Sequence, residues 1–113
     1  VHDTVCAAVS HLPHVTAYAL TAAIADAAEK MPEIYGLGAG GFNDTTRIAS
    51  SSPQMWRDIF LLNRDAVLDA VERMESRLAE LRQLIDRADS AGLEKFFAGM
   101  RDVRQRVLKG QSS

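Results

Sequence analysis

The strongest constraint on the fold is an apolar repeat in the second half of the chain. Apolar side chains recur there at alternating steps of four and three residues, at Val67, Val71, Met74, Leu78, Leu81 and Ile85. This spacing puts them on one face of an α-helix and is typical of a seam that packs against another helix. We therefore predict a long helix that restarts at Asn63 and has an apolar face in need of a partner.

The first part of the chain has the same helical period. Residues 2–31 carry an apolar or small side chain every three or four positions and are rich in alanine, which favours a long helix and close helix packing. Pro13 interrupts this segment and cannot donate to the carbonyl of Val9. We expect a kink or a break near Leu12.

Two shorter helices are predicted in the middle of the chain. Residues 32–43 contain a proline and four glycines and read as a loop. After this loop, Asn43 or Asp44 is expected to cap a short helix that ends near Ser50.

Ser52 and Pro53 form a good N-cap and N1 pair for a helix over residues 53–62. Near the C-terminus, Ser90 is expected to cap a last amphipathic helix that Gly110 ends. No segment alternates as a strand does, so the predicted fold class is all-α.

The stretch GLGAGG, residues 36–41, matches the dinucleotide-binding fingerprint G-x-G-x-x-G. That fingerprint binds a pyrophosphate only where it joins a buried strand to a helix. No strand is predicted before it, and Asp58, at about the distance of a ribose ligand, falls inside a predicted helix. We interpret the match as accidental and expect no cofactor-binding residue in this chain.

Composition and charge narrow the function classes. The chain has 113 residues, 47% of them hydrophobic, which suits one compact domain. A formal net charge of −2 favours neither nucleic acid nor an anionic membrane as a partner. The cations near the C-terminus read as a solvated helix end and not as a nucleic-acid face; they are Lys95, Arg101, Arg104, Arg106 and Lys109.

Cys6 is the single cysteine, so no disulfide can form within the chain and a reducing cytoplasm fits. No apolar run is long enough to span a membrane. The first residues, VHDTVC, have neither an initiator Met nor the basic region of a signal peptide. We therefore expect a piece of a longer protein.

Residues 40–58 form the densest polar cluster beside glycines. Arg47 offers a planar donor fork that matches a carboxylate or phosphate, and Ser50, Ser51 and Ser52 add hydroxyls. An anion site is one interpretation. The other is that Arg47 pairs with Asp44 or Asp58 and that the serines cap a helix.

Three histidines lie close to the N-terminus. His11 and His14 are three residues apart without the glutamate of a zinc-protease helix, and His2 lies far along the helix, so no metal ligand is predicted. Ser10 and His11 are adjacent and would point to different sides of a helix, which disfavours a nucleophile and base pair. A hydrogen-bonding histidine beside the Pro13 kink and a half-buried structural histidine both stay open.

The sequence SHLPH at 10–14 and the sequence GGFNDTTRIASSSPQMWRDIFLLN at 40–63 together resemble the C-terminal helical domain of prephenate and arogenate dehydrogenases. The resemblance covers nearly the whole chain and weakens in the last helix. It implies that residues 1–113 are a helical dimerisation and substrate-binding domain, similar to the C-terminal domain of 6-phosphogluconate dehydrogenase, in an intertwined homodimer.

The resemblance also implies an activity for the parent enzyme. Such enzymes oxidatively decarboxylate prephenate to 4-hydroxyphenylpyruvate, or arogenate to tyrosine, with NAD or NADP in tyrosine biosynthesis. An N-terminal Rossmann domain, absent from this chain, binds the cofactor and carries the catalytic histidine. This chain alone is therefore expected to have no catalytic residue and no turnover, and tyrosine is a candidate inhibitor.

Several positions match the substrate side of that family. Arg47 resembles its substrate-carboxylate arginine, and prephenate is a dianion that needs a fixed cationic group. His14 is similar to a histidine that lines the pocket. The remaining expected substrate-binding residues match the loop that shapes the pocket or positions around it, and they are Gly40, Gly41, Asp44, Ser51 and Trp56.

Two departures from the family pattern concern the size of the pocket: Ala39 replaces a usual third glycine and Thr45 a usual aromatic residue. The alternative function is a non-catalytic helical interaction module, in which the apolar repeat and the glycine-rich segment are purely architectural.

Overall fold

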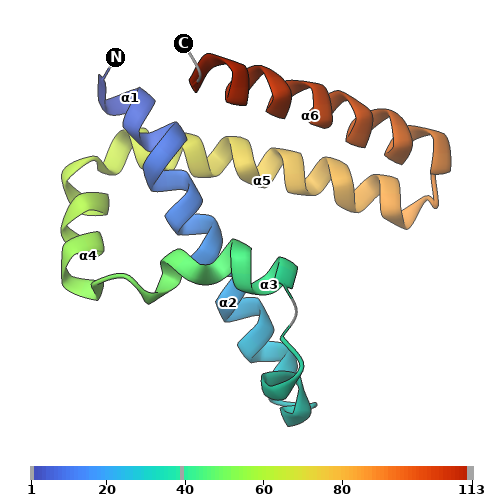
Figure 1. Cartoon of the computed structure of the whole chain (residues 1–113), viewed down its shortest axis with the longest axis horizontal. Coiled ribbons are helices and arrows are strands. Elements are labelled where there is room, and N and C mark those ends of the chain that lie inside the picture. Colours follow the sequence, from blue (N-terminus) through green and yellow to red (C-terminus); the bar gives the residue numbers. More distant parts are fainter. Residues whose placement is uncertain (1, 39, 112–113) are drawn as a thin grey trace. The chain divides into compact units, whose positions relative to one another are not determined.

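The computed structural model describes residues 2–38 and 40–111, and every regular element in them is helical (Figure 1). No strand occurs in these two ranges, so the predicted all-α class is confirmed. The chain divides into two compact units, the first ending at Arg73 and the second beginning at Met74.

The first helical path runs through α1 (His2–Cys6), a π-helical turn η1 (Ala7–His11) and α2 (Leu12–Ala28). Pro13 lies in the first turn of α2. The irregularity expected near Leu12 is therefore confirmed, in the form of a π-helical turn that precedes the proline. A wider turn allows the helical path to continue where Pro13 has no N–H to donate.

The glycine-rich segment differs from its prediction. A 3₁₀-helix η2 spans Pro32–Gly36, and α3 already begins at Gly40 and runs to Thr46. The prediction of a loop over 32–43 is thus wrong at both ends, and Asn43 and Asp44 lie inside α3 and do not cap it.

Packing explains why this glycine-rich segment is helical. Both α3 and the 3₁₀-helix η3 (Arg47–Ser50) lie against α2, and tertiary contacts override the weak helix propensity of glycine. Thr45 and Thr46 donate side-chain hydrogen bonds of 2.7 Å to the carbonyls of Gly41 and Phe42. The predicted end near Ser50 is confirmed.

The next helix, α4 (Pro53–Leu62), has the predicted start. The Ser52 hydroxyl accepts a hydrogen bond of 3.3 Å from the backbone N–H of Met55. Asn63 then separates α4 from α5 (Arg64–Asp86), as the restart of the pattern indicated.

The last helix is α6 (Ser90–Gln111), and Figure 1 shows it running back along the second half of α5. Its cap is Asp89 and not Ser90, because the Asp89 carboxylate accepts a hydrogen bond of 2.9 Å from the backbone N–H of Gly92. Gly110 does not end the helix, which includes it and continues to Gln111.

A small core forms where the first helical path meets the start of α5. Ala7, Val67 and Ala70 are buried there, with half-buried neighbours at Leu12, Val15, Ala66 and Val71. The predicted seam is thus confirmed at its N-terminal end. Further along, Met74 and Leu81 are half-buried, whereas Leu78 is 55% exposed and Ile85 65% exposed, so part of the seam stays open to solvent.

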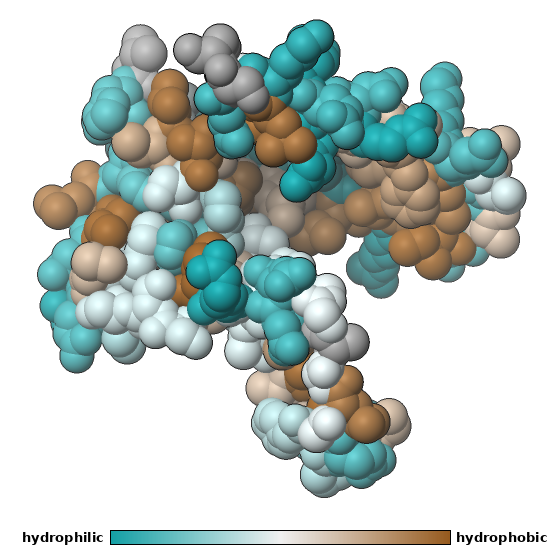
Figure 2. Space-filling model, in the orientation of Figure 1, coloured by the Kyte–Doolittle hydropathy of each residue, from teal (hydrophilic) through white to brown (hydrophobic). Residues whose placement is uncertain are grey.

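Apolar side chains also reach the surface elsewhere. Figure 2 shows them along the hairpin of α5 and α6 and around the end of α2. Among the described helices, none combines the length and the apolar character needed to cross a bilayer.

Candidate functional site

An aromatic cluster forms where α4 packs against the first helical path. Trp56, in α4, is only 8% exposed. Its ring stacks on that of His14 in α2, with centroids 3.4 Å apart and planes 18° apart. His11 and Phe60 meet Trp56 edge-on at 6.0 Å and 5.7 Å. Residues more than forty positions apart in the sequence thereby build one wall.

The imidazole of His14 is held in place by a backbone carbonyl. Nδ1 of His14 lies 3.0 Å from the carbonyl oxygen of Ser10, so Nδ1 donates and carries a proton. In the neutral ring the other nitrogen, Nε2, is then an acceptor. The ring is thus oriented by its own helix and by Trp56, which leaves one nitrogen for a ligand.

Asn63 fixes the second histidine of the wall. Its amide Nδ2 donates to the carbonyl oxygen of Asp3 at 2.9 Å and lies 3.2 Å from Nδ1 of His11. Because the amide is a donor, Nδ1 of His11 accepts and its proton sits on Nε2. Asn63 is not among the predicted site residues; its signals in the sequence are its place between two predicted helices and at the end of the 40–63 segment.

Arg47 is the first residue of η3, and its side chain is exposed. Within the part of the chain that the structure describes, its guanidinium has no ion-pair partner. Asp58, one of its two expected partners, pairs with Arg57 at 3.0 Å. The interpretation that Arg47 pairs with Asp44 or Asp58 is therefore wrong, and the arginine is available to an external anion.

The serines have structural roles. The hydroxyl of Ser51 donates to the carbonyl oxygen of Ile48 at 2.6 Å and closes the end of η3, and Ser52 caps α4. The capping interpretation is confirmed for these two residues. A role of Ser51 in ligand binding stays a prediction. Its hydroxyl hydrogen is already donated to the carbonyl oxygen of Ile48.

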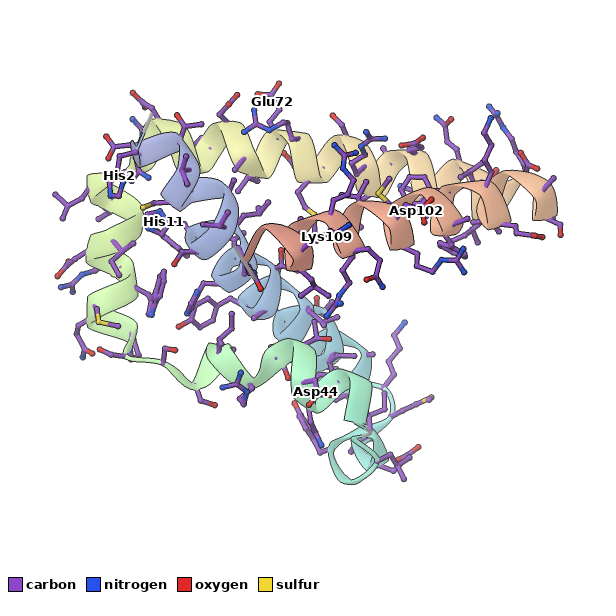
Figure 3. The ribbon with its side chains drawn as sticks, turned by 45° about the horizontal axis from the view of Figure 1, so that its top comes forward. His2, His11, Asp44, Glu72, Asp102 and Lys109 are labelled. Carbon is purple, nitrogen blue, oxygen red and sulfur yellow. The ribbon has the colours of Figure 1, made fainter. Side chains whose placement is uncertain are left out.

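Gly40, Gly41 and Asp44 lie in α3 and are exposed. A Cβ added at Gly40 or Gly41 would meet no atom within 4 Å, so nothing in the described residues requires a glycine at either position. Figure 3 shows Asp44 on α3, well away from His11. The structure therefore joins His14 and Trp56 directly, whereas Asp44 lies on another element, away from His11.

Neither a metal site nor a nucleotide loop is seen in the described residues. No group of three or more metal-binding side chains gathers in 2–38 and 40–111. His2 lies at the N-terminal end of the chain, with Nε2 3.5 Å from Sγ of Cys6. The GLGAGG stretch follows a 3₁₀-helix and no strand, although Ala39 within it lies outside the described residues.

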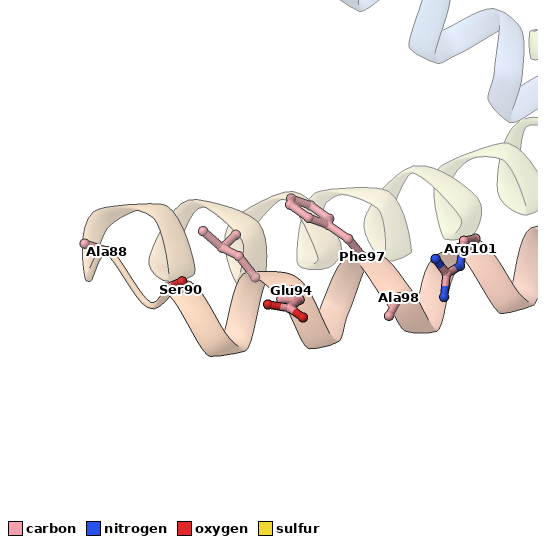
Figure 4. A pocket seen from close by; sticks show the side chains of 7 residues that line it. Ala88, Ser90, Glu94, Phe97, Ala98 and Arg101 are labelled. Carbon is pink, nitrogen blue, oxygen red and sulfur yellow. The ribbon is translucent and has the colours of Figure 1, made fainter.

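Two open pockets lie elsewhere. One of about 710 Å³ runs along the start of α6, and Figure 4 shows Phe97 and Arg101 among its lining residues. Another of about 580 Å³ is lined by apolar groups of α2, η2 and α3, including Ile24, Tyr35 and Phe42. Neither is lined by Arg47, His14 or Trp56, so the candidate site is a wall and not an enclosed cavity in this chain.

The fold and the site define a class of protein: an all-helical domain with an exposed arginine on η3, unpaired within the described residues, and a wall of stacked histidine and tryptophan. Residues 1–101 match the family described as "Prephenate dehydrogenase, dimerization domain". The chain belongs to this family, which confirms the resemblance read from SHLPH and the 40–63 segment.

Characterised relatives agree. The chain is 38% identical over 103 residues to a prephenate dehydrogenase of Bacillus subtilis, covering 91% of this chain and 28% of that protein. It is also 38% identical over 104 residues to a cyclohexadienyl dehydrogenase of Zymomonas mobilis, covering 91% of this chain and 36% of the relative. The chain thus spans about a third of the length of these relatives.

Solved structures show the same fold. A prephenate dehydrogenase from A. aeolicus, in complex with hydroxyphenyl propionate and NAD+, is 41% identical with a TM-score of 0.80, covering 94% of this chain and 37% of the other. A Synechocystis arogenate dehydrogenase is 25% identical with a TM-score of 0.86, covering 93% and 38%.

Proposed function

We propose that residues 1–113 are the dimerisation and substrate-binding domain of an enzyme that oxidatively decarboxylates prephenate or arogenate with NAD or NADP in tyrosine biosynthesis. The family membership and the names of the relatives support this activity. The activity belongs to the parent enzyme, in which a further N-terminal domain would bind the cofactor and provide the catalytic histidine.

One observation carries the proposal: Arg47 is exposed and has no ion-pair partner in residues 2–38 and 40–111. A guanidinium binds a carboxylate through two parallel hydrogen bonds, and both candidate substrates carry carboxylates. Arg47 would therefore hold a substrate carboxylate, and the packing of η3 against α2 would fix its position relative to His14.

The structure supports some of the other expected site residues more than others. His14 has one ring nitrogen without a hydrogen bond among the described residues, which suits a polar group of a substrate, and the buried Trp56 holds that ring by stacking. Gly40 and Gly41 leave open space above α3 that a ligand could occupy. Asp44 and Ser51 stay in the proposal on the family resemblance alone.

We also propose that the chain forms a homodimer through its exposed apolar side chains. The family name refers to dimerisation. The seam positions Leu78 and Ile85 are more than half exposed, as are Tyr35 and Leu37 beside the pocket at the end of α2. A second copy would cover such surfaces, because large exposed apolar patches mark interaction sites. The proposed location is the cytoplasm, because a single cysteine that forms no disulfide suits a reducing compartment.

The test restores the upstream domain and measures reduction of NAD and of NADP with prephenate and with arogenate separately. The proposal predicts turnover with at least one substrate and cofactor pair. Absence of turnover with every pair, from a protein shown to be folded and dimeric, would reject the enzyme and leave the helical interaction module.

A further inference from the structure

One side chain joins distant parts of the first compact unit. Asn63 lies between α4 and α5, and its Nδ2 donates to the carbonyl oxygen of Asp3 in α1 at 2.9 Å. The same Nδ2 lies 3.2 Å from Nδ1 of His11 in the π-helical turn η1. Asn63 is 60 residues from Asp3 and 52 from His11 in the sequence, so its amide links the α4–α5 junction to two turns of the first helical path.

The Asp3 carbonyl decides which atom of the amide faces the histidine. A carbonyl oxygen only accepts hydrogen bonds, so the atom at 2.9 Å from it is the amide nitrogen of Asn63 and not the amide oxygen. The second hydrogen of that nitrogen is then donated to Nδ1 of His11, which must be an acceptor. Asn63 therefore selects the neutral tautomer of His11 that carries its proton on Nε2.

The indole ring of Trp56 depends on ring contacts for its orientation. Its Nε1 is buried and has no hydrogen-bond partner in the described part of the chain. The ring is held by stacking on His14 at 3.4 Å and by edge contacts with His11 at 6.0 Å and Phe60 at 5.7 Å. Figure 3 shows His11 between the first helical path and α4. The amide that fixes His11 thus bears on the orientation of Trp56.

We propose that Asn63 is a positioning residue of the substrate site, which holds the His11 ring edge-on against Trp56 and thereby keeps Trp56 stacked on His14. This inference rests on the proposed function, in which His14 faces the substrate. Asn63 acts through His11, since both hydrogens of its amide nitrogen are donated within the chain. It supports binding and not the chemical step, so its loss raises KM with little change in kcat.

The kinetic test uses the parent enzyme with its upstream domain and the substrate that it turns over. Asn63→Leu has nearly the same size and cannot donate. We expect it to raise KM about three- to tenfold, the loss of one neutral hydrogen bond, with kcat within about twofold. The same change in a His11→Phe background should raise KM by less than about twofold, because the acceptor is already gone.

A second measurement reports the tautomer directly and needs no variant of Asn63. In the wild-type parent enzyme with 15N-labelled histidine, at about pH 8, His11 should show a protonated Nε2 and an unprotonated Nδ1. The spectrum of the His11→Phe variant identifies the His11 resonances. Asn63→Asp has the same shape but accepts instead of donating, so it should move the proton to Nδ1 and raise KM.

Asp89→Ala is the control for a loss of stability alone. It removes the carboxylate that caps α6, in the second unit, and should lower the melting temperature. KM and the His11 resonances should stay unchanged, because Asp89 has no part in the aromatic wall. A change of KM that merely follows stability would appear in this variant as well.

Several results would overturn the inference. A wild-type His11 with its proton on Nδ1 contradicts the assigned hydrogen bond. An unchanged KM in folded Asn63→Leu, or an equal rise of KM in both backgrounds, shows that the amide does not act through His11. If Asn63→Leu does not fold, an unchanged KM in Asn63→Asp contradicts the inference in its place. A parent enzyme with the expected His11 resonances but no turnover would instead reject the proposed function.

Discussion

At the scale of single residues, the candidate site depends on side chains that are held by bonds to the backbone. The Ser10 carbonyl orients His14, and the Asn63 amide orients His11. These bonds leave one nitrogen of each ring without a hydrogen bond among the described residues. Because the two rings are already oriented, the entropic cost of binding a ligand is lower.

Gly41 tests whether a ligand approaches the backbone of α3. A Cβ at Gly41 meets no atom within 4 Å, so Gly41→Ala should be neutral or stabilise the helix by up to about 1 kcal/mol. If the substrate lies there, the KM of the parent enzyme should rise. Gly99→Ala in α6 is the control, because a Cβ at Gly99 also meets nothing within 4 Å. An unchanged KM for Gly41→Ala would remove this glycine from the site.

The sequence pattern could not predict how these residues meet. Periodicity placed His14 and Trp56 on their own helices, but their stacking depends on tertiary packing over a separation of more than forty residues. The sequence also could not predict that Arg47 lacks an ion-pair partner among the described residues, because Asp44 and Asp58 both lie close to it in the sequence. Among the described residues Arg47 forms an ion pair with neither aspartate, and Asp58 pairs with Arg57.

At the scale of elements, local signals predicted helix starts better than helix ends. Ser52 and Pro53 specify their helix through groups adjacent in sequence, and the seam shows where α5 lies. The start of α6 was missed by one residue, since both Asp89 and Ser90 can cap a helix. The helical state of Gly40 and Gly41 reflects packing on α2, which no local signal contains.

The turn between α5 and α6 contains a strained residue. Ala88 has a φ of 50°, the left-handed region that favours glycine. Ala88→Gly should therefore raise the free energy of unfolding by about 1 kcal/mol, measured by denaturant titration. Ala91→Gly, inside the first turn of α6, should lower it by about 0.5–1 kcal/mol. A destabilised Ala88→Gly variant would show that the turn is not strained as described.

At the scale of the whole molecule, the chain buries few large side chains. The core is built mainly on alanines and valine, while large apolar residues of α5 and α6 stay exposed. A single copy therefore leaves much of its apolar surface in water, which is unfavourable by about 25 cal/mol for each Å². This imbalance is the physical argument for a dimer.

Leu78→Asp tests the dimer. A carboxylate on the exposed seam should convert the dimer to monomers or shift its dissociation constant by more than tenfold, measured by analytical ultracentrifugation. Gln83→Asp adds the same charge on the opposite face of α5 and should leave the dimer intact. Circular dichroism checks that both variants remain helical. A fully dimeric Leu78→Asp variant would exclude this part of the seam from the interface.

The most direct test of the central claim is the KM of Arg47→Ala in the parent enzyme. A charge-assisted hydrogen bond contributes about 1.5–3 kcal/mol, so the KM for the accepted substrate should rise roughly 10- to 150-fold. Arg57→Ala, which removes only an exposed ion pair with Asp58, should change the KM less than twofold. If Arg47→Ala leaves the KM unchanged while the wild type turns over, Arg47 does not bind the substrate carboxylate.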